Sequence, residues 1–157
     1  MAKQQNVTVL FPSAVRERVL EQHQALRELL KQTLDATTRT FQPDGPDREE
    51  LSRLIHELRA RFRAHLAFEE LHLVPVLAHV DLWGPERVQD LFQEHTRQRA
   101  ELETLVEGIG SGWGVEHLAV ALRSLTTDLF IDMQEEERGA VSAELLRDQM
   151  VLIGAVD

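Results

Sequence analysis

Four long stretches of helical periodicity constrain the fold of this 157-residue chain more than any other feature. In each stretch, apolar residues recur every three or four positions, which is the spacing of a helix with one buried face. The expected helices span about residues 14–37, 47–78, 85–109 and 114–138. No alternating strand pattern or internal repeat competes with this interpretation. Helices of this length with short connections predict an all-α fold, an up-down-up-down four-helix bundle with a short C-terminal extension.

The segments between these stretches carry helix start and stop signals. We expect Ser13 to cap the first helix, and Asp47 with Glu50 to form a capping box at the start of the second. Pro85 is suited to the first turn of the third helix, whereas Pro75 is expected to kink the last turn of the second. The glycine-rich segment GIGSGWG separates the last two helices.

Composition bounds the class of protein. The length suits a single domain spanning residues 1–157, and 43% hydrophobic with 28% charged residues is ordinary for a globular fold. No apolar run approaches the roughly 18 to 20 residues of a membrane span, and the N-terminus lacks the pattern of a signal peptide. We therefore expect a cytoplasmic protein without a membrane partner. A net charge of -10 argues against nucleic-acid binding, and the sequence leaves the oligomeric state open.

The chain contains no cysteine, which restricts the kinds of metal site that it can build. Disulfides, thiolate zinc sites, iron–sulfur clusters and covalent haem attachment through cysteine are all excluded. Any metal ion must be held by histidine and carboxylate side chains.

Each predicted helix carries such side chains on its apolar face, where leucine would be expected. These candidate ligands are His23 on the first helix, His65 and Glu69 on the second, His95 on the third, and Asp132 and Glu136 on the fourth. The pairs within one helix are four residues apart and so point the same way. Positions about 10 residues into the first and third helices face positions about 18 residues into the second and fourth, since neighbouring helices run in opposite directions. All of these side chains can therefore meet at one level.

Energetics favour a metal site at that level. Burying three carboxylates together without compensation would cost several kcal/mol per charge. Two divalent cations would nearly cancel this charge, with neutral imidazoles completing the coordination. A donor set of histidine and carboxylate suits iron or manganese, and zinc is possible.

Less specific interpretations exist for single residues. One histidine on an apolar helix face is more often a hydrogen-bonded core residue than a ligand, so the agreement among four helices carries the argument. His72 can be an extra ligand, but we favour a position in the outer shell or at the solvated rim. Glu70 points away from His65 and is expected to be solvated. Glu136 is preferred over its neighbours because it lies four residues after Asp132, and we read the remaining histidines, His56, His79 and His117, as surface residues.

Four segments together resemble a known family. LEQHQALRELL, HLAFEELHLVPVL, FQEHTRQRAEL and DMQEEE resemble the bacterial hemerythrin-like domains with the His-His-Glu cation-binding signature. The resemblance implies a four-helix bundle holding a non-haem di-iron centre. By this resemblance His23 and His65 bind one iron and His95 the other, while Glu69 and Glu136 bridge them. In relatives the fold serves dioxygen carriage, sensing of oxygen, nitric oxide or iron, and iron or peroxide handling.

Two positions depart from the family pattern. Asp132 stands where the fourth-helix motif has histidine, and Arg99 stands where oxygen carriers have a second histidine on the third helix. A site with two iron ions is the favoured interpretation, and a mononuclear site or a scaffold without metal stays open. An anionic ligand in place of histidine should stabilise the ferric state, so we predict that the protein is not a reversible oxygen carrier.

The expected function is therefore a non-haem di-iron protein that binds or reacts with dioxygen, peroxide or nitric oxide. One alternative is a metal-dependent sensing or binding module. Another is an iron-binding protein without turnover. Buried carboxylates at the level of the histidines argue against a haem bundle.

Overall fold

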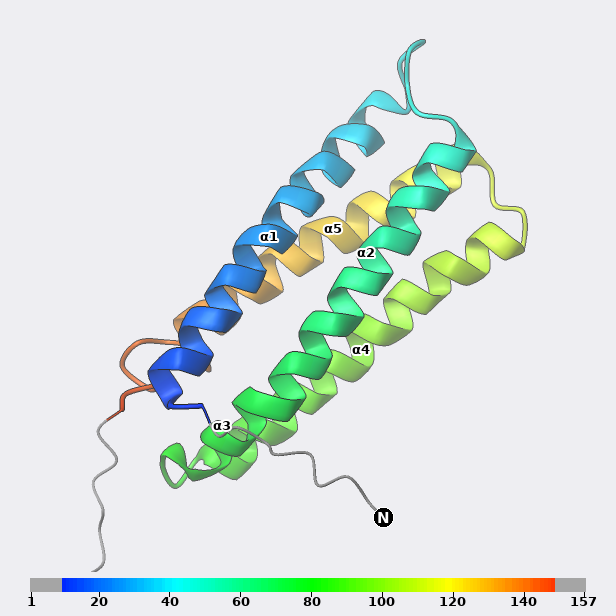
Figure 1. The fold of residues 1–157 in the computed structure, drawn as a ribbon. Helices are drawn as coiled ribbons and strands as arrows, with labels where there is room; N and C mark the ends of the chain where they lie inside the picture. Colours follow the sequence, from blue (N-terminus) through cyan, green and yellow to red (C-terminus); the bar gives the residue numbers. More distant parts are fainter. Residues whose placement is uncertain (1–9, 149–157) are drawn as a thin grey trace, which may run out of the picture.

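The computed structural model describes residues 10–148. All regular structure in this range is helical, and four long rods run antiparallel (Figure 1), which confirms the all-α four-helix bundle. The second rod is continuous but consists of three helical segments. The elements are α1 (Pro12–Arg39), α2 (Arg48–Phe68), the π-helical turn η1 (Glu69–Leu73), α3 (Val74–Val80), α4 (Gly84–Gly110) and α5 (Val115–Arg138).

Two of the expected helix starts are confirmed and one is wrong. The Asp47 side chain accepts a hydrogen bond from the Glu50 amide at 2.8 Å, and Pro85 lies in the first turn of α4. The first helix, however, begins at Pro12, so Ser13 lies inside it and is not its N-cap. Proline suits this position because its missing amide would be unpaired there in any case.

The second rod contains a π-helical turn just before Pro75, the residue at which a kink was expected. Residues 69–73 form a π-helical turn, in which the Val74 amide donates to the Glu69 carbonyl five residues earlier. Pro75 follows at once and has no amide to donate to a carbonyl in the preceding turn. Such single π-turns inside α-helices frequently occur at functional sites.

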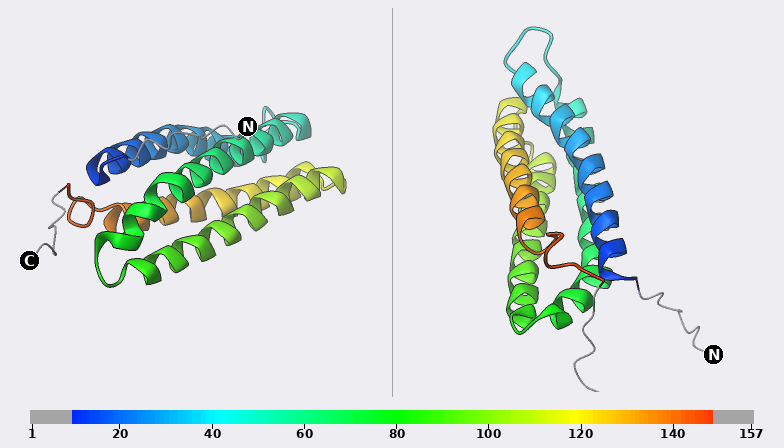
Figure 2. Two further views of the ribbon diagram at one scale, coloured as in Figure 1. Left: turned by 60° about the horizontal axis from the view of Figure 1, so that its bottom comes forward. Right: turned by 90° about the vertical axis from the view of Figure 1, so that its left-hand side faces the viewer.

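The segment after α5 returns across the end of the bundle to the start of α1 (Figure 2). Both the amide and the hydroxyl of Ser13 donate to the Asp148 carboxylate, and the Arg16 guanidinium donates to the Val141 carbonyl at 3.0 Å. This segment is the described part of the expected C-terminal extension. Residues 149–157 of that extension, and residues 1–9 of the expected domain, lie outside the described residues.

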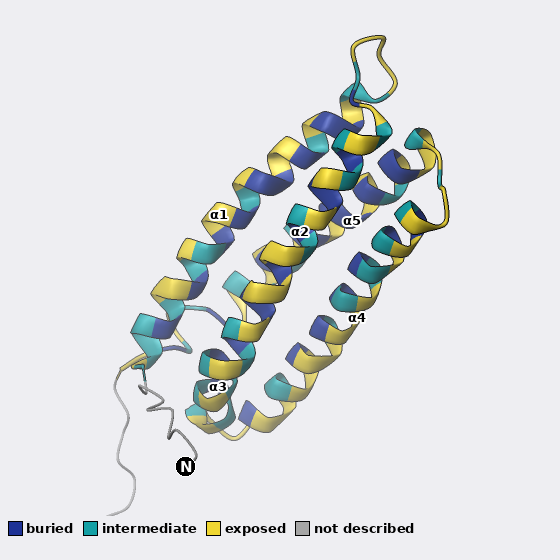
Figure 3. Ribbon diagram, turned by 45° about the vertical axis from the view of Figure 1, so that its right-hand side comes forward, coloured by how far each residue is buried: buried dark blue, intermediate teal, exposed yellow. Residues whose placement is uncertain are grey.

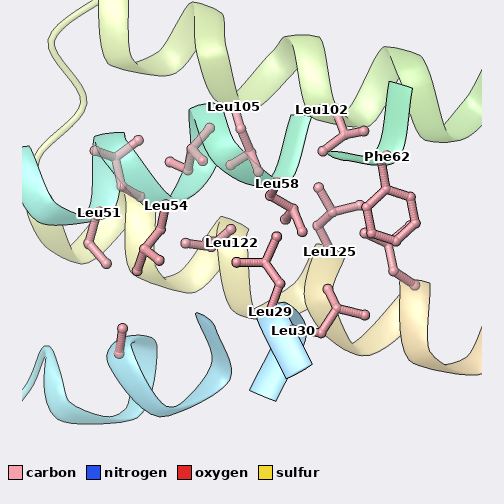
Figure 4. Close-up of a cluster of buried hydrophobic side chains, with 14 of the residues drawn as sticks. Leu29, Leu30, Leu51, Leu54, Leu58, Phe62, Leu102, Leu105, Leu122 and Leu125 are labelled. Carbon is pink, nitrogen blue, oxygen red and sulfur yellow. The ribbon is translucent and has the colours of Figure 1, made fainter. Parts of the chain in front are cut away.

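Buried residues follow the inward faces of the rods (Figure 3) and form two apolar clusters. The larger cluster fills the half of the bundle around Phe62 and Leu122 (Figure 4). The smaller one lies at the other end and includes Val19, Leu73 and Leu91. On every rod, buried or partly buried polar side chains lie between the two clusters. None of the helices within residues 10–148 is long and apolar enough to cross a membrane.

Candidate metal centre

The polar layer between the two clusters brings together five of the candidate ligands. His23 comes from α1, His65 from α2, Glu69 from the start of η1, His95 from α4 and Glu136 from α5. All but Glu136 belong to the buried residues, and its side chain is only 8% exposed. Each occupies an inward-facing position of its helix, where an apolar core residue would otherwise lie. The arrangement of the helix backbones therefore places these side chains at one level.

Glu69 lies at the centre of this layer. Its Oε1 atom is 3.0 Å from His65 Nε2 and 3.7 Å from His23 Nε2, whereas its Oε2 atom is 2.9 Å from His95 Nε2. Glu136 Oε1 approaches His23 Nε2 at 3.4 Å. One carboxylate oxygen therefore faces the histidines of α1 and α2, and the other faces the histidine of α4.

A compact donor set lies on one side of Glu69. His23, His65, Glu69 and Glu136 each offer a ligand atom, and these four atoms lie within 4.8 Å of one another. Three of the buried atoms, His23 Nε2, Glu69 Oε1 and Glu136 Oε1, have no hydrogen-bond partner. Orphaned polar atoms are costly in a core, and here they all point at one another. A bound cation would satisfy all three, so the residues present fit a metal ion.

Outer side chains orient all three histidines in the same way. His23 Nδ1 is 2.9 Å from Glu137, His65 Nδ1 is 2.8 Å from Gln22, and His95 Nδ1 is 2.9 Å from Glu70. A proton held on Nδ1 by an acceptor leaves Nε2 free to face the centre. Partners of this kind fix the tautomer and orientation of metal-binding histidines.

Two arginines balance the charge of the outer carboxylates. Arg27 contacts Glu137 at 2.8 Å, and Arg99 makes two hydrogen bonds to Glu70, at 2.6 and 2.9 Å. The pKa of Glu70 lies below its usual range, chiefly because of the hydrogen bonds from Arg99. Burial would raise the pKa of Glu137, but the hydrogen bond from Arg27 helps to hold it below its usual range. The outer shell thus adds little net charge to the layer.

Without a metal ion, the layer takes up positive charge from protons. Burial by itself would lower the pKa of His23, but the nearby carboxylates of Glu136 and Glu69 raise that pKa to about 10. Burial would raise the pKa of Glu69, yet the surrounding histidines hold it well below its usual value. Burial and the charge of Glu69 together raise the pKa of Glu136 well above its usual value. The layer therefore favours a cation at this place.

Comparison with protein families agrees with this geometry. The family model of the hemerythrin HHE cation binding domain matches residues 14–143. The chain belongs to this family. No curated protein and no solved structure matches it.

Asp132, at the family's fourth-helix histidine position, turns to other partners. Its carboxylate accepts hydrogen bonds from Arg97 at 2.7 Å and from Gln98 at 3.0 Å, and it lies outside the four-residue donor set. Gln98 also reaches Glu94, whose pKa rises to about 7 because of burial and the nearby charge of Asp132. The HHE domain thus has an acidic pair beside His95 that is bridged by an amide.

His72 also lies outside that donor set. Its half-buried ring packs on Phe68 with a centroid distance of 4.7 Å.

The prediction that Glu70 is solvated is wrong, because its side chain contacts His95 and Arg99. That expectation assumed a regular rotation of 100° per residue, whereas the π-helical turn begins at Glu69 and directs Glu70 toward His95 and Arg99.

Sequence reasoning missed the outer shell of this HHE domain, although a signal for it exists. Gln22, Glu70 and Glu137 each follow or precede a candidate ligand directly in the chain. Each reaches the histidine of a neighbouring helix: Gln22 on α1 reaches α2, Glu70 on η1 reaches α4, and Glu137 on α5 reaches α1. A polar residue adjacent to an inward-facing ligand is the pattern that would have indicated them.

Proposed function

We propose that this chain is a non-haem iron protein of the HHE family whose iron binds or reacts with dioxygen, peroxide or nitric oxide. The first ion would be held by His23, His65, Glu69 and Glu136. The observation that carries this proposal is the set of three buried atoms that have no hydrogen-bond partner and point at one another. The Nδ1 atoms of His23 and His65 already contact outer side chains, so their Nε2 atoms face the centre. Mixed imidazole and carboxylate donors suit iron, with manganese and zinc as competitors.

A second ion, as expected from the sequence, would occupy a less complete position. His95 Nε2 and Glu69 Oε2 face each other there, but each already has the other as its partner at 2.9 Å. Asp132 could join only after leaving Arg97 and Gln98. We therefore propose two sites of unequal strength, the first filling well before the second.

Bound iron would supply the reactivity toward dioxygen, peroxide or nitric oxide, and the protein side chains would set its conditions. The apolar clusters on either side exclude bulk water, and the outer carboxylates keep the imidazoles oriented. Two anionic carboxylates among four donors favour the ferric ion. We therefore propose that the protein is not a reversible oxygen carrier, because a carrier must keep returning to the ferrous state.

Metal content provides the direct test of the binding proposal. Protein from iron-supplied cells should carry iron, and His65→Ala or Glu69→Ala should remove most of it because each deletes a donor of the first site. His56→Ala is the matched control, since His56 is an exposed histidine on the same helix. Wild-type protein that stays free of metal after anaerobic reconstitution would refute the proposal.

Mixing the reduced protein with oxygenated buffer tests the reactivity. We expect rapid and irreversible oxidation of the iron. The change in the visible absorption spectrum monitors this oxidation. A new absorption band that persists for many minutes and vanishes on deoxygenation would instead indicate a carrier. Asp132→His should prolong any such band if Asp132 approaches the iron.

Two alternatives share the metal site with the proposed reactive centre. Both differ from it because their bound ion would consume no oxidant. In a metal-dependent sensing or binding module, or in an iron-binding protein without turnover, the ion would bind equally well but no oxidant would be consumed. Measuring the consumption of dioxygen or peroxide by the iron-loaded protein separates these alternatives from a reactive centre. A cytoplasmic location and the absence of a nucleic-acid partner remain predictions from composition.

A further inference from the structure

A cleft of about 470 Å³ lies against the metal centre. It is bounded by the first half of α4, the last turn of α5 and the segment of residues 139–145 that follows α5. Five carboxylates line it, from Asp90, Glu94, Glu135, Glu136 and Glu144, against a single basic side chain, Arg87. Arg87 is itself paired with Asp81, so its charge is already balanced. Even when Glu94 and Glu136 hold protons, Asp90, Glu135 and Glu144 leave the cleft with a net negative charge.

Glu136 belongs to both the cleft and the metal centre. It lines the cleft, yet its Oε1 atom is buried without a hydrogen-bond partner and lies 3.4 Å from His23 Nε2. The side chain is only 8% exposed. A buried carboxylate with an unused acceptor thus forms the boundary between an acidic cleft and a set of imidazole donors.

We propose that this cleft is the entry route by which divalent cations reach the centre, an inference that rests on the proposed metal-binding function. Clefts lined by charge of one sign concentrate ions of the opposite sign and raise their association rates by roughly 10- to 1,000-fold. A hydrated cation would meet the carboxylates of the cleft first and then pass to Glu136, which is part of the donor set. Anions would be repelled along the same route.

The experiment measures the rate of metal uptake separately from affinity. Metal-free full-length protein is mixed with Co²⁺ in a stopped-flow instrument, and the absorption of the bound ion is followed. The test variant is Asp90→Asn/Glu135→Gln, which removes two exposed cleft charges, one on α4 and one on α5, and replaces no proposed ligand. The matched control is Glu107→Gln/Glu116→Gln, which removes two exposed charges from the opposite ends of the same two helices.

At low ionic strength, the cleft variant should take up Co²⁺ about three- to tenfold more slowly than wild type, while the control should match wild type. Added salt should slow the wild type more than the cleft variant, because screening acts on the charges that the variant lacks. Glu135→Lys should slow uptake further. The number of Co²⁺ ions bound at equilibrium should be the same in all of these proteins.

Equal uptake rates in the cleft variant and wild type would overturn the proposal, and so would equal slowing in the control. In either case an unchanged number of bound ions would leave the metal-binding function standing. Failure of wild-type protein to bind Co²⁺ at all, or full binding by His65→Ala, would instead refute the metal site and the entry route together.

Discussion

The large apolar cluster and the polar layer are built on the same four rods and are buried to the same degree, but they satisfy their polar groups differently. Within the apolar cluster, Thr33 and Thr126 donate their hydroxyls to carbonyls of their own helices, at 2.8 and 2.7 Å. In the polar layer, by contrast, atoms of His23, Glu69 and Glu136 are buried and unpaired. One region is complete as folded, and the other requires a cation to complete it.

This difference separates the region that stabilises the fold from the region that would bind a metal ion. Burial of apolar surface in the two clusters favours the fold regardless of metal. The polar layer gains little from burial, because its carboxylates lose their hydration without full compensation. The bundle therefore holds the donors together at a cost in stability, and metal binding should offset that cost. Four predictions test this division between the two regions.

The largest effect is expected from the apolar cluster. Phe62 is 1% exposed, and Phe62→Ala should lower the free energy of unfolding by about 3 to 5 kcal/mol because it leaves a cavity in a packed core. Urea denaturation of the metal-loaded and metal-free forms measures this loss, which should be similar in both. Val120→Ala is the control, since Val120 is 59% exposed and its loss should change little. A Phe62→Ala penalty confined to the metal-loaded form would break the division.

Metal removal should have the next largest effect. A ligand present at a hundredfold excess over its Kd stabilises the folded state by about 3 kcal/mol, so the metal-free protein should melt at a lower temperature. His65→Ala should show no such response, because it lacks a donor of the first site. Identical melting curves for wild-type protein with and without metal would show that the polar layer is already complete by itself.

The stability of the metal-free protein should also depend on pH. The pKa of His23 rises from 6.5 in the unfolded chain to about 10 in the fold, so folding takes up a proton between these values. This contribution is fully present below about pH 6.5 and is lost as the pH rises toward 10. The raised pKa of Glu136 acts in the same direction, while the lowered pKa of Glu69 matters only under acidic conditions.

Denaturation of the metal-free protein at several pH values between 7 and 10 checks this expectation. Stability should fall as the pH rises. His23→Gln should flatten the dependence. A stability that increases toward pH 10 would contradict the assigned protonation.

The outer shell should have the smallest effect, and mainly on affinity. Glu137→Leu removes the acceptor of His23 Nδ1, and loss of such partners typically weakens metal binding by about 10- to 100-fold. Glu137→Gln keeps an acceptor oxygen and should weaken binding less. Competition with a metal chelator measures both variants. Glu57→Gln removes a charge from a surface ion pair of α2 and serves as the control; an equal loss there would argue against a specific role for Glu137.

The sequence by itself determined much of this architecture. Helical periodicity predicted the four rods, because the spacing of apolar residues depends only on the geometry of one helix. The same reasoning placed His23, His65, Glu69, His95 and Glu136 on inward faces at one level, since helices of similar length align their positions by a fixed rise per residue. The HHE family pattern was also recognisable, because it follows from these spacings.

Only the tertiary structure decided which side chains complete the layer. Asp132 has the spacing of a ligand, but Arg97 and Gln98 on the neighbouring helix engage its carboxylate. Glu70 has the spacing of a solvated residue, but the π-helical turn brings it to His95 and Arg99. Periodicity describes where a side chain leaves its own helix. The partner that it meets depends on contacts between helices and on local departures from regular geometry, and neither of these is encoded in the spacing of residues along one helix.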